Sequence, residues 1–337
     1  MICGAEGWKD IENFGKTKLE YLRKFFDFKY GAPSDDTFRR FFRCLDPEIF
    51  KELFRDWVKS LALSTGSKVI AIDGKCNRHS FDGDGNPLHM VSAFAAEARI
   101  VLGQEKVDDK SNEITAIPKL LEALDIKGSI VTIDAMGCQF EIANNIVNRE
   151  ADYVFSLKGN QGNMCDDVTL YFQDSELKKQ CKSIVDCDKG HGRFETRECF
   201  VSTDVEWLRL RHPKWQTIRS IVQINATRET KGKITSESRH FISSLEVIPE
   251  EMLRTIRFHW AIENSLHWIL DMSFNEDYLR IRKGNAPEIM AIIRHMALNL
   301  LQSGCEKGQS IKELRKLCAW DENILGNILI ARPSKSS

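Results

Sequence analysis

The stretch Lys68-Val-Ile-Ala-Ile-Asp-Gly-Lys75 decides the fold, because four apolar residues lead directly into a carboxylate, Asp73. Short apolar runs rich in β-branched residues are typical of strands that are covered on both faces of a sheet. The same pattern returns as Ile130-Val-Thr-Ile-Asp134. In sheets of this kind, ligands collect beyond the ends of the strands. We therefore predict two buried strands that deliver two carboxylates to one place.

Two carboxylates held close together raise each other's pKa and cost free energy unless a cation or a proton lies between them. A divalent metal ion is the simplest explanation for such a pair. The alternative is that Asp73 and Asp134 each cap the turn or helix that follows their strand. The recurrence of the pattern favours the metal.

Composition describes a globular protein without an overall charge bias. The chain has 337 residues, of which 42% are hydrophobic, and its net charge is −1. This length suits one large domain or two, and any nucleic-acid surface must be local because no general basicity is present. The ten cysteines form no C-x-x-C pair, and the sequence contains neither a signal peptide nor a long apolar run. These features predict reduced thiols in a cytoplasmic protein that does not enter a membrane.

The N-terminal region, from Trp8 to about Leu63, has apolar residues at helical spacing. A break at Gly31-Ala-Pro-Ser34 precedes a second helix, for which Ser34 or Asp35 is the expected N-cap. A third helix follows Pro47. Short helices joined by tight turns suit a helix-turn-helix DNA reader, although most such hairpins are packing units, so both interpretations stay open.

The order of the next elements predicts a ribonuclease-H-like fold. After the Asp73 strand we expect strands at 88–96 and 100–107, a helix at 115–124, the Asp134 strand, a helix at 139–148 and a strand at 153–157. In that α/β fold, a mixed sheet with flanking helices, the first and fourth strands lie side by side and carry acidic metal ligands. The segment Asp82-Gly-Asp-Gly-Asn86 resembles part of a calcium loop but lacks the later glutamate, so we expect a hairpin turn there.

Between Cys181 and Leu245 the pattern becomes alternating, with β-like segments at 194–201, 217–227 and 234–243. Residues 205–245 contain eight Lys or Arg and three Asp or Glu, which suits a phosphate-binding surface but also a solvated sheet. The domain organisation expected is an N-terminal helical region at 1–66, a ribonuclease-H-like core at 67–180, a β-rich insertion at 181–246, core helices at 247–303 and a C-terminal tail at 304–337.

Glu263 is the best candidate for a third acidic ligand. The segment 249–274 is strongly helical, and at 100° per residue Glu263 falls on the same face as Ile256, Trp260 and Leu270. A carboxylate on an apolar face is costly unless it is paired or bound to metal. A salt bridge to Arg257 or Arg282, or a position at the edge of the apolar face, would also explain it. A fourth possibility is a zinc site made by ligands one turn apart, at His259, Glu263, His267 and Asp271.

Nine phrases spread over nearly the full length resemble the bacterial H-repeat-associated transposases of the ISAs-type insertion-sequence family. These phrases are Trp8–Gly15, Pro33–Phe38, Ile72–Lys75, Val107–Pro118, Ile133–Gln139, Leu157–Gln161, Asp188–Arg193, Trp260–Trp268 and Arg280–Pro287. The resemblance implies a DDE transposase with a ribonuclease-H-like core and a β-rich insertion before the helix that carries the last acid. The triad would be Asp73, Asp134 and Glu263, which would hold two Mg²⁺ ions, with Mn²⁺ as a substitute.

The resemblance also implies double-stranded DNA as partner, both as element terminal repeats and as target, and a homodimer on DNA that is cytoplasmic and associated with the nucleoid. We expect the DNA contacts to come from Lys158, Asn160, Lys189, His191, Arg193, Arg280, Arg282 and Lys283.

Two departures from the family pattern stand out. The wider superfamily tends to have arginine four residues before the final glutamate and lysine seven after it, where this chain has His259 and Leu270. The phosphate-binding role of those residues would then pass to Arg280, Arg282 or Lys283. Relatives also extend further at the N-terminus, so Met1-Ile-Cys-Gly-Ala5 would fall inside a helix and the chain would be truncated.

Three alternatives to an active transposase follow from these observations. The first is a truncated, inactive remnant that only binds DNA, and the second is a metal-dependent nuclease or phosphohydrolase on the same fold without strand transfer. The third is a zinc hydrolase built on the Glu263 helix.

Overall fold

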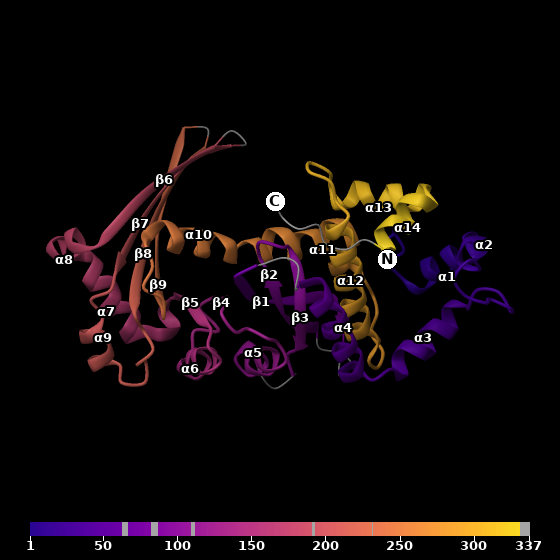
Figure 1. The fold of residues 1–337 in the computed structure, drawn as a ribbon, viewed down its shortest axis with the longest axis horizontal. Coiled ribbons are helices and arrows are strands. Elements are labelled where there is room, and N and C mark those ends of the chain that lie inside the picture. Colours follow the sequence, from indigo (N-terminus) through magenta and orange to yellow (C-terminus); the bar gives the residue numbers. More distant parts are fainter. Residues whose placement is uncertain (63–66, 82–86, 109–111, 191–192, 231, 331–337) are drawn as a thin grey trace. The chain divides into compact units, whose positions relative to one another are not determined.

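The computed structural model describes residues 1–62, 67–81, 87–108, 112–190, 193–230 and 232–330 (Figure 1). The chain divides into two compact units. Unit 1 comprises Met1–Ser67, Gly74–Asn112 and Ala261–Ser337, and unit 2 comprises Lys68–Asp73 and Glu113–Trp260. Strand β1, Val69–Phe81, belongs to both, because its first residues pair within unit 2 and its later residues lie in unit 1.

Unit 1 is largely helical and also holds two complete strands. Its strands β2, Pro87–Ala95, and β3, Ile100–Lys106, form an antiparallel pair, with β2 next to β1 in the sheet order. The helices are α1 Trp8–Thr17, α2 Leu19–Leu22, α3 Asp35–Cys44, α4 Pro47–Ala62, the π-helical turn η2 Glu263–His267, α11 Trp268–Phe274, η3 Glu276–Tyr278, α12 Ala286–Ser303, α13 Ile311–Trp320 and α14 Glu322–Ile330.

Local sequence explains the start of α3. The hydroxyl of Ser34 accepts a hydrogen bond from the Thr37 backbone N–H at 3.3 Å, which confirms Ser34 as the N-cap. On the same helix Phe42 stacks on Trp8 of α1, with ring centroids 5.3 Å apart. Both rings pack against a buried cluster formed by Ile281, Ala286 and Met290.

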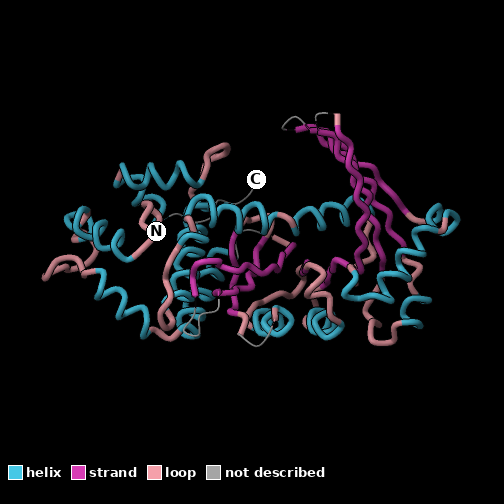
Figure 2. The backbone as a smooth tube through the Cα atoms, turned by 180° about the vertical axis from the view of Figure 1, so that it is seen from behind, coloured by secondary structure: helices cyan, strands magenta, loops and turns pink. Residues whose placement is uncertain are grey.

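Unit 2 is built on a mixed sheet with the strand order β1-β4-β5-β9-β8-β7-β6. Strands β1, β4 and β5 are parallel, and the remaining pairs are antiparallel. The strands are β4 Ile130–Ile133, β5 Asp152–Leu157, β6 Lys182–Gly190, β7 Arg193–Ser202, β8 Ser220–Thr230 and β9 Lys233–Ser243. In Figure 2 the last four are the long magenta tubes that run side by side. The helices are α5 Glu113–Glu122, α6 Phe140–Asn148, η1 Gly159–Gln161, α7 Gly162–Gln173, α8 Ser175–Gln180, α9 Glu206–Arg211 and α10 Pro249–His259.

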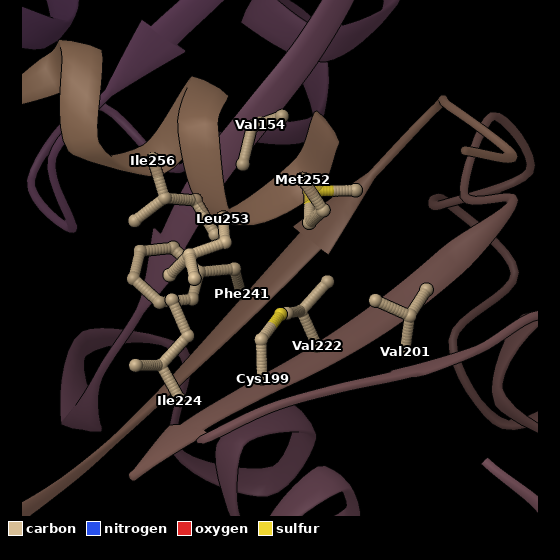
Figure 3. Packing of buried hydrophobic residues seen from close by; sticks show 9 residues of the cluster. All are labelled: Val154, Cys199, Val201, Val222, Ile224, Phe241, Met252, Leu253 and Ile256. Carbon is tan, nitrogen blue, oxygen red and sulfur yellow. The ribbon is translucent and has the colours of Figure 1, made fainter. Parts of the chain in front are cut away.

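Helix α10 lies on the sheet of unit 2 and buries an apolar face against it. Figure 3 shows Met252, Leu253 and Ile256 of this helix close to side chains of β7, β8 and β9. The strand residues in this cluster include Val222 and Phe241, which are 0% and 6% exposed. Full burial of one such side chain stabilises a fold by about 1.5–3 kcal/mol, so this cluster holds α10 against the sheet.

The predicted ribonuclease-H-like mixed α/β fold is confirmed. The order β3-β2-β1 in unit 1 and β1-β4-β5 in unit 2 places the first and fourth strands side by side, with Ile72 paired to Ile133. The expected strands and helices between residues 87 and 157 are present with shifts of one or two residues at their ends. The expected β-like segments at 194–201, 217–227 and 234–243 correspond to β7, β8 and β9.

Three predictions of local structure were wrong, and several elements were missed. Strand β1 does not end at Asp73 but runs on to Phe81, and the sheet order gives it β2 as a second neighbour besides β4. Met1–Ala5 is not helical; it forms a turn in which Gly4 has φ +93°. The predicted helix at 249–274 is interrupted by the π-helical turn η2. Helices α7, α8, α9, α13 and α14 and strand β6 were not predicted, and the 82–86 turn lies outside the described residues.

No helix in the described ranges is both long and apolar enough to span a bilayer.

Candidate active site

Asp73 and Asp134 lie beside each other in unit 2. Each follows the last residue of the paired segment of its strand, and those two residues, Ile72 and Ile133, are partners in the parallel β1–β4 ladder. Neighbouring strands lie about 4.8 Å apart, so the two acidic residues leave the ladder at the same level. Both side chains are partly exposed, whereas Ile72 and Ile133 are buried. The two carboxylates thus lie where the buried parts of these strands meet the solvent.

The Asp134 carboxylate organises the turn that follows β4. Its Oδ1 accepts hydrogen bonds from the backbone N–H groups of Met136, at 3.0 Å, and Gly137, at 3.4 Å. The capping interpretation is therefore correct for Asp134, but the turn uses only one of the two carboxylate oxygens. Burial and the nearby Glu113 carboxylate raise the pKa of Asp134, while the two N–H groups and Lys158 oppose that shift. A cation at this position would stabilise the ionised Asp134 carboxylate against both unfavourable effects, burial and the Glu113 charge.

A second loop is fastened to the Asp134 turn. The loop Lys158–Gln161 leaves the end of β5, which pairs with β4 through Ile133 and Phe155. The Asn160 side-chain amide donates a hydrogen bond to the Ala135 carbonyl, and that of Gln161 donates one to the Cys138 carbonyl at 2.7 Å. Asn160, expected to contact DNA, thus holds the two loops together, and the Lys158 side chain next to it is exposed.

His259 fastens the end of α10 to the middle of β4. Its Nδ1 is 3.0 Å from Oγ1 of Thr132, a residue that is 2% exposed and lies two positions before Asp134. Burial lowers the pKa of His259 to about 4, so the imidazole is neutral near pH 7. At the position where the superfamily tends to carry arginine, this chain has an uncharged residue that fixes the helix end.

Glu263 belongs to unit 1 and does not fit the apolar face assigned to it. The π-helical turn Glu263–His267 breaks the 100° spacing, and the Glu263 side chain is exposed, as is 42% of Trp260. The argument from a costly buried carboxylate is therefore wrong. A salt bridge to Arg257 is also absent, because Arg257 pairs with Asp186 at 3.0 Å and Asp188 at 3.6 Å.

The zinc interpretation of the Glu263 helix finds no support. His259 is bound to Thr132, and Asp271 forms an ion pair with Lys75 of β1. Among the residues that the structure describes, no group of three or more His, Cys, Asp or Glu side chains gathers closely enough to hold a metal ion. The neighbouring Asp73 and Asp134 nevertheless fit Mg²⁺ in donor chemistry, since this ion prefers carboxylate oxygens and is usually held by one or two of them.

The other basic residues expected to contact DNA fall into two groups. Lys189 and Arg193 are exposed where β6 and β7 approach their connection, and His191 lies outside the described residues. Arg280, Arg282 and Lys283 are exposed in unit 1 between η3 and α12, where Arg282 Nε donates to the His79 carbonyl at 3.2 Å.

A buried charge network in unit 1 escaped prediction. Glu276 accepts from Lys75 Nζ at 2.8 Å through Oε2 and from the Arg294 guanidinium at 3.1 Å through Oε1. The Glu276 and Arg294 side chains are each 2% exposed. One sequence signal was present, because Arg294 and His295 interrupt the otherwise apolar run 289–298.

The chain is similar to known proteins over nearly its full length. Residues 64–300 match the model of a transposase DDE domain, and residues 1–58 match that of a region associated with it. The "H repeat-associated putative transposase YhhI" of Escherichia coli strain K12 is 41% identical over 98% of this chain and 89% of its own length. The "Putative transposase YncI" of Escherichia coli O157:H7 is 40% identical over 98% of this chain and 86% of its own.

Among solved structures, a piggyBac transposase synaptic complex with hairpin DNA aligns with 99% of this chain and 81% of its own. Its sequence identity is 10% and its TM-score is 0.42, a value too low to establish a shared fold by itself.

Proposed function

This chain belongs to the family of transposases with a DDE domain, and we propose that it cleaves and joins DNA strands at the ends of an insertion sequence. The observation that carries the proposal is the pair Asp73 and Asp134, which adjacent parallel strands bring out at the same level. Among the described residues, the Cys138 thiol that follows the Asp134 turn does not suit a covalent nucleophile, since it is buried and its pKa is raised by burial. A pair of acids suits phosphoryl transfer to water or to a 3′-hydroxyl.

We propose Asp73, Asp134 and Glu263 as the catalytic triad, which would together hold two Mg²⁺ ions. When bound, the ions would lower the pKa of the attacking hydroxyl and stabilise the leaving 3′-oxygen. The protein's contribution is to hold Asp134 rigidly, through Met136 and Gly137 on one side and through the Lys158–Gln161 loop on the other.

For DNA binding we propose Lys158, Lys189, His191, Arg193, Arg280, Arg282 and Lys283, supported by the exposure of those among them that the structure describes. Because two element ends must be joined, we further propose a homodimer on DNA. Phosphate contacts of this kind position the protein without reading sequence, so the terminal repeat must be recognised elsewhere.

The test is a gel assay with a labelled duplex that carries the terminal repeats of the flanking element, with Mg²⁺ or Mn²⁺. Asp73→Asn should abolish nicking at the element end while DNA binding stays intact or becomes stronger, because a metal-bound carboxylate is lost and a negative charge near the DNA is removed. The matched control is Asp125→Asn, an exposed aspartate of unit 2, which should nick like the wild type.

Three other outcomes would change the assignment. Equal loss of binding and nicking in Asp73→Asn would contradict its role as a metal ligand. Nicking that accepts water but never a 3′-hydroxyl end would identify a nuclease. Binding without nicking by the wild type would identify an inactive DNA-binding protein.

A further inference from the structure

We propose that Lys158 binds the phosphate group that is cleaved, and thus supplies the positive charge that His259 does not. This inference deepens the proposed function and rests on it. It assigns the phosphate contact to the end of β5, not to Arg280, Arg282 or Lys283, the residues favoured by the sequence.

Lys158 lies at the same edge of the sheet as Asp134. Strand β5 lies next to β4 in parallel, and Phe155 pairs with Ile133, the residue before Asp134. Lys158 follows the end of β5, so it leaves the sheet on the same side as Asp134. The hydrogen bonds of Asn160 and Gln161 to the Asp134 turn keep the lysine backbone in that place.

The positive charge of Lys158 acts on several titratable groups around it. It opposes the rise of the Asp134 pKa that burial causes, and it adds to the lowering of the pKa values of His259 and of Glu237 on β9. Groups from β4, α10 and β9 thus all lie within range of one ammonium. Salt screens exposed charges over about 10 Å, so a phosphate bound beside Asp134 would also feel Lys158.

Three other basic side chains of α10 and β9 are either neutral or already paired with carboxylates. Arg239 donates two hydrogen bonds of 2.7 Å to Glu237 and lies 4.2 Å from the centre of the Trp260 ring. Arg257 is paired with Asp186 and Asp188, and His259 is neutral. Lys158 is exposed and forms no salt bridge with the part of the chain that the structure describes. Its charge is therefore available to a ligand.

The chemistry needs such a charge. In the cleavage step, water attacks phosphorus, the bond from phosphorus to the 3′-oxygen breaks, and the products are a 3′-hydroxyl and a 5′-phosphate. Negative charge on the phosphoryl oxygens must be stabilised throughout, and a lysine ammonium serves as a point charge for phosphate. Lys158 transfers no proton in this scheme; it binds one non-bridging oxygen.

The experiment pairs Lys158→Met with neutral phosphates in the DNA. Nicking by the wild type first maps the cleaved phosphate. Binding is then measured in an Asp73→Asn background, with duplexes that carry one methylphosphonate either at the cleaved position or one position to either side. Lys182→Met, an exposed lysine at the start of β6, is the matched control.

We expect Lys158→Met to weaken binding of the unmodified duplex about tenfold, typical of one lost charge-assisted contact, and to reduce the salt slope by about one. With methylphosphonate at the cleaved position, Lys158→Met and its parent should bind equally. Lys158→Arg should keep most of the affinity, and Lys182→Met should show no dependence on the modified position. Thermal unfolding should be unchanged in all variants, since these side chains are exposed.

A tenfold difference that persists with the neutral cleaved phosphate, or that disappears only at a flanking position, would overturn the inference. So would wild-type binding by Lys158→Met. Lack of nicking by the wild type would instead refute the proposed function, and with it the assignment of a cleaved phosphate. The two failures are therefore distinguishable.

Discussion

Replacing Glu276 with glutamine tests the buried charge network of unit 1. The Glu276 carboxylate uses both oxygens, one for Lys75 and one for Arg294, and is 2% exposed. Burial alone would raise its pKa, but the two cations hold the pKa at about 2, against an ordinary value of 4.5. A difference of about 2.5 pH units corresponds to about 3 kcal/mol. Removal of one partner of a buried ion pair costs about 3–5 kcal/mol, which is of the same order.

The sign follows from the direction of the pKa shift. Because the folded-state pKa of Glu276 lies below its unfolded value, the stabilisation is complete above pH 4.5 and is lost as the pH falls toward 2. At pH 7 the glutamine variant should therefore lose about 3 kcal/mol of unfolding free energy in unit 1. The variant leaves the Arg294 guanidinium buried beside a neutral amide. Burial disfavours the charged form of Arg294, and it lowers the pKa of this group for that reason.

The assay is urea unfolding at pH 7, with hydrogen exchange of α12 peptides to report on unit 1 separately. Glu20→Gln is the matched control, since Glu20 pairs with Arg23 at 2.6 Å but is 85% exposed. Its loss should be below about 1 kcal/mol. The reasoning is refuted if Glu276→Gln costs no more than Glu20→Gln, because burial would then not strengthen the interaction.

Two further predictions concern buried histidine interactions. Burial lowers the pKa of His295 to about 4, and since the unfolded imidazole titrates near 6.5, stability should fall as the pH drops from 7 to 5, by about 2 kcal/mol for this group. His295→Gln should flatten that pH dependence in urea unfolding, and an unchanged slope would contradict the assignment. Thr132→Val should cost about 1–3 kcal/mol of unit 2 stability, because Nδ1 of His259 loses its buried partner. The same substitution at the exposed Thr227 serves as the control, and equal effects would show that the hydrogen bond is unimportant.

The core strands were predictable because a single property, burial on both faces, dictates their sequence. Apolar runs such as 69–72 and 130–133 leave few alternatives to a central parallel strand, and Asp73 and Asp134 were placed side by side from that pattern alone. Strand β6 was missed because it borders the sheet. Its exposed residues include charged side chains such as Lys182 and Asp188, so the apolar signal disappears.

Periodicity failed at Glu263 for a geometric reason. The helical-face prediction assumes 3.6 residues per turn throughout 249–274, but α10 ends at His259 and a π-helical turn begins at Glu263. Leu270 and Phe274 are buried as predicted, whereas Glu263 is exposed. Such turns occur often at functional sites, which makes the departure compatible with a role for Glu263. The role itself is a prediction that the Asp73 experiment can be extended to test with Glu263→Gln.

Two lysines that look alike in the sequence have opposite environments. Lys75 and Lys158 both come shortly after an apolar run of the sequence, and each stands next to glycine. Lys75 is 12% exposed, and its charge is taken up by Asp271 and Glu276, which lie about two hundred residues further along the chain. Lys158 is exposed and has no such carboxylates within the described ranges. Folding pairs the Lys75 ammonium with carboxylates of the protein itself, whereas that of Lys158 has no such partner within the described ranges. Of the two lysines, Lys158 is therefore the one whose charge is available to bound DNA. The sequence by itself could not distinguish the two.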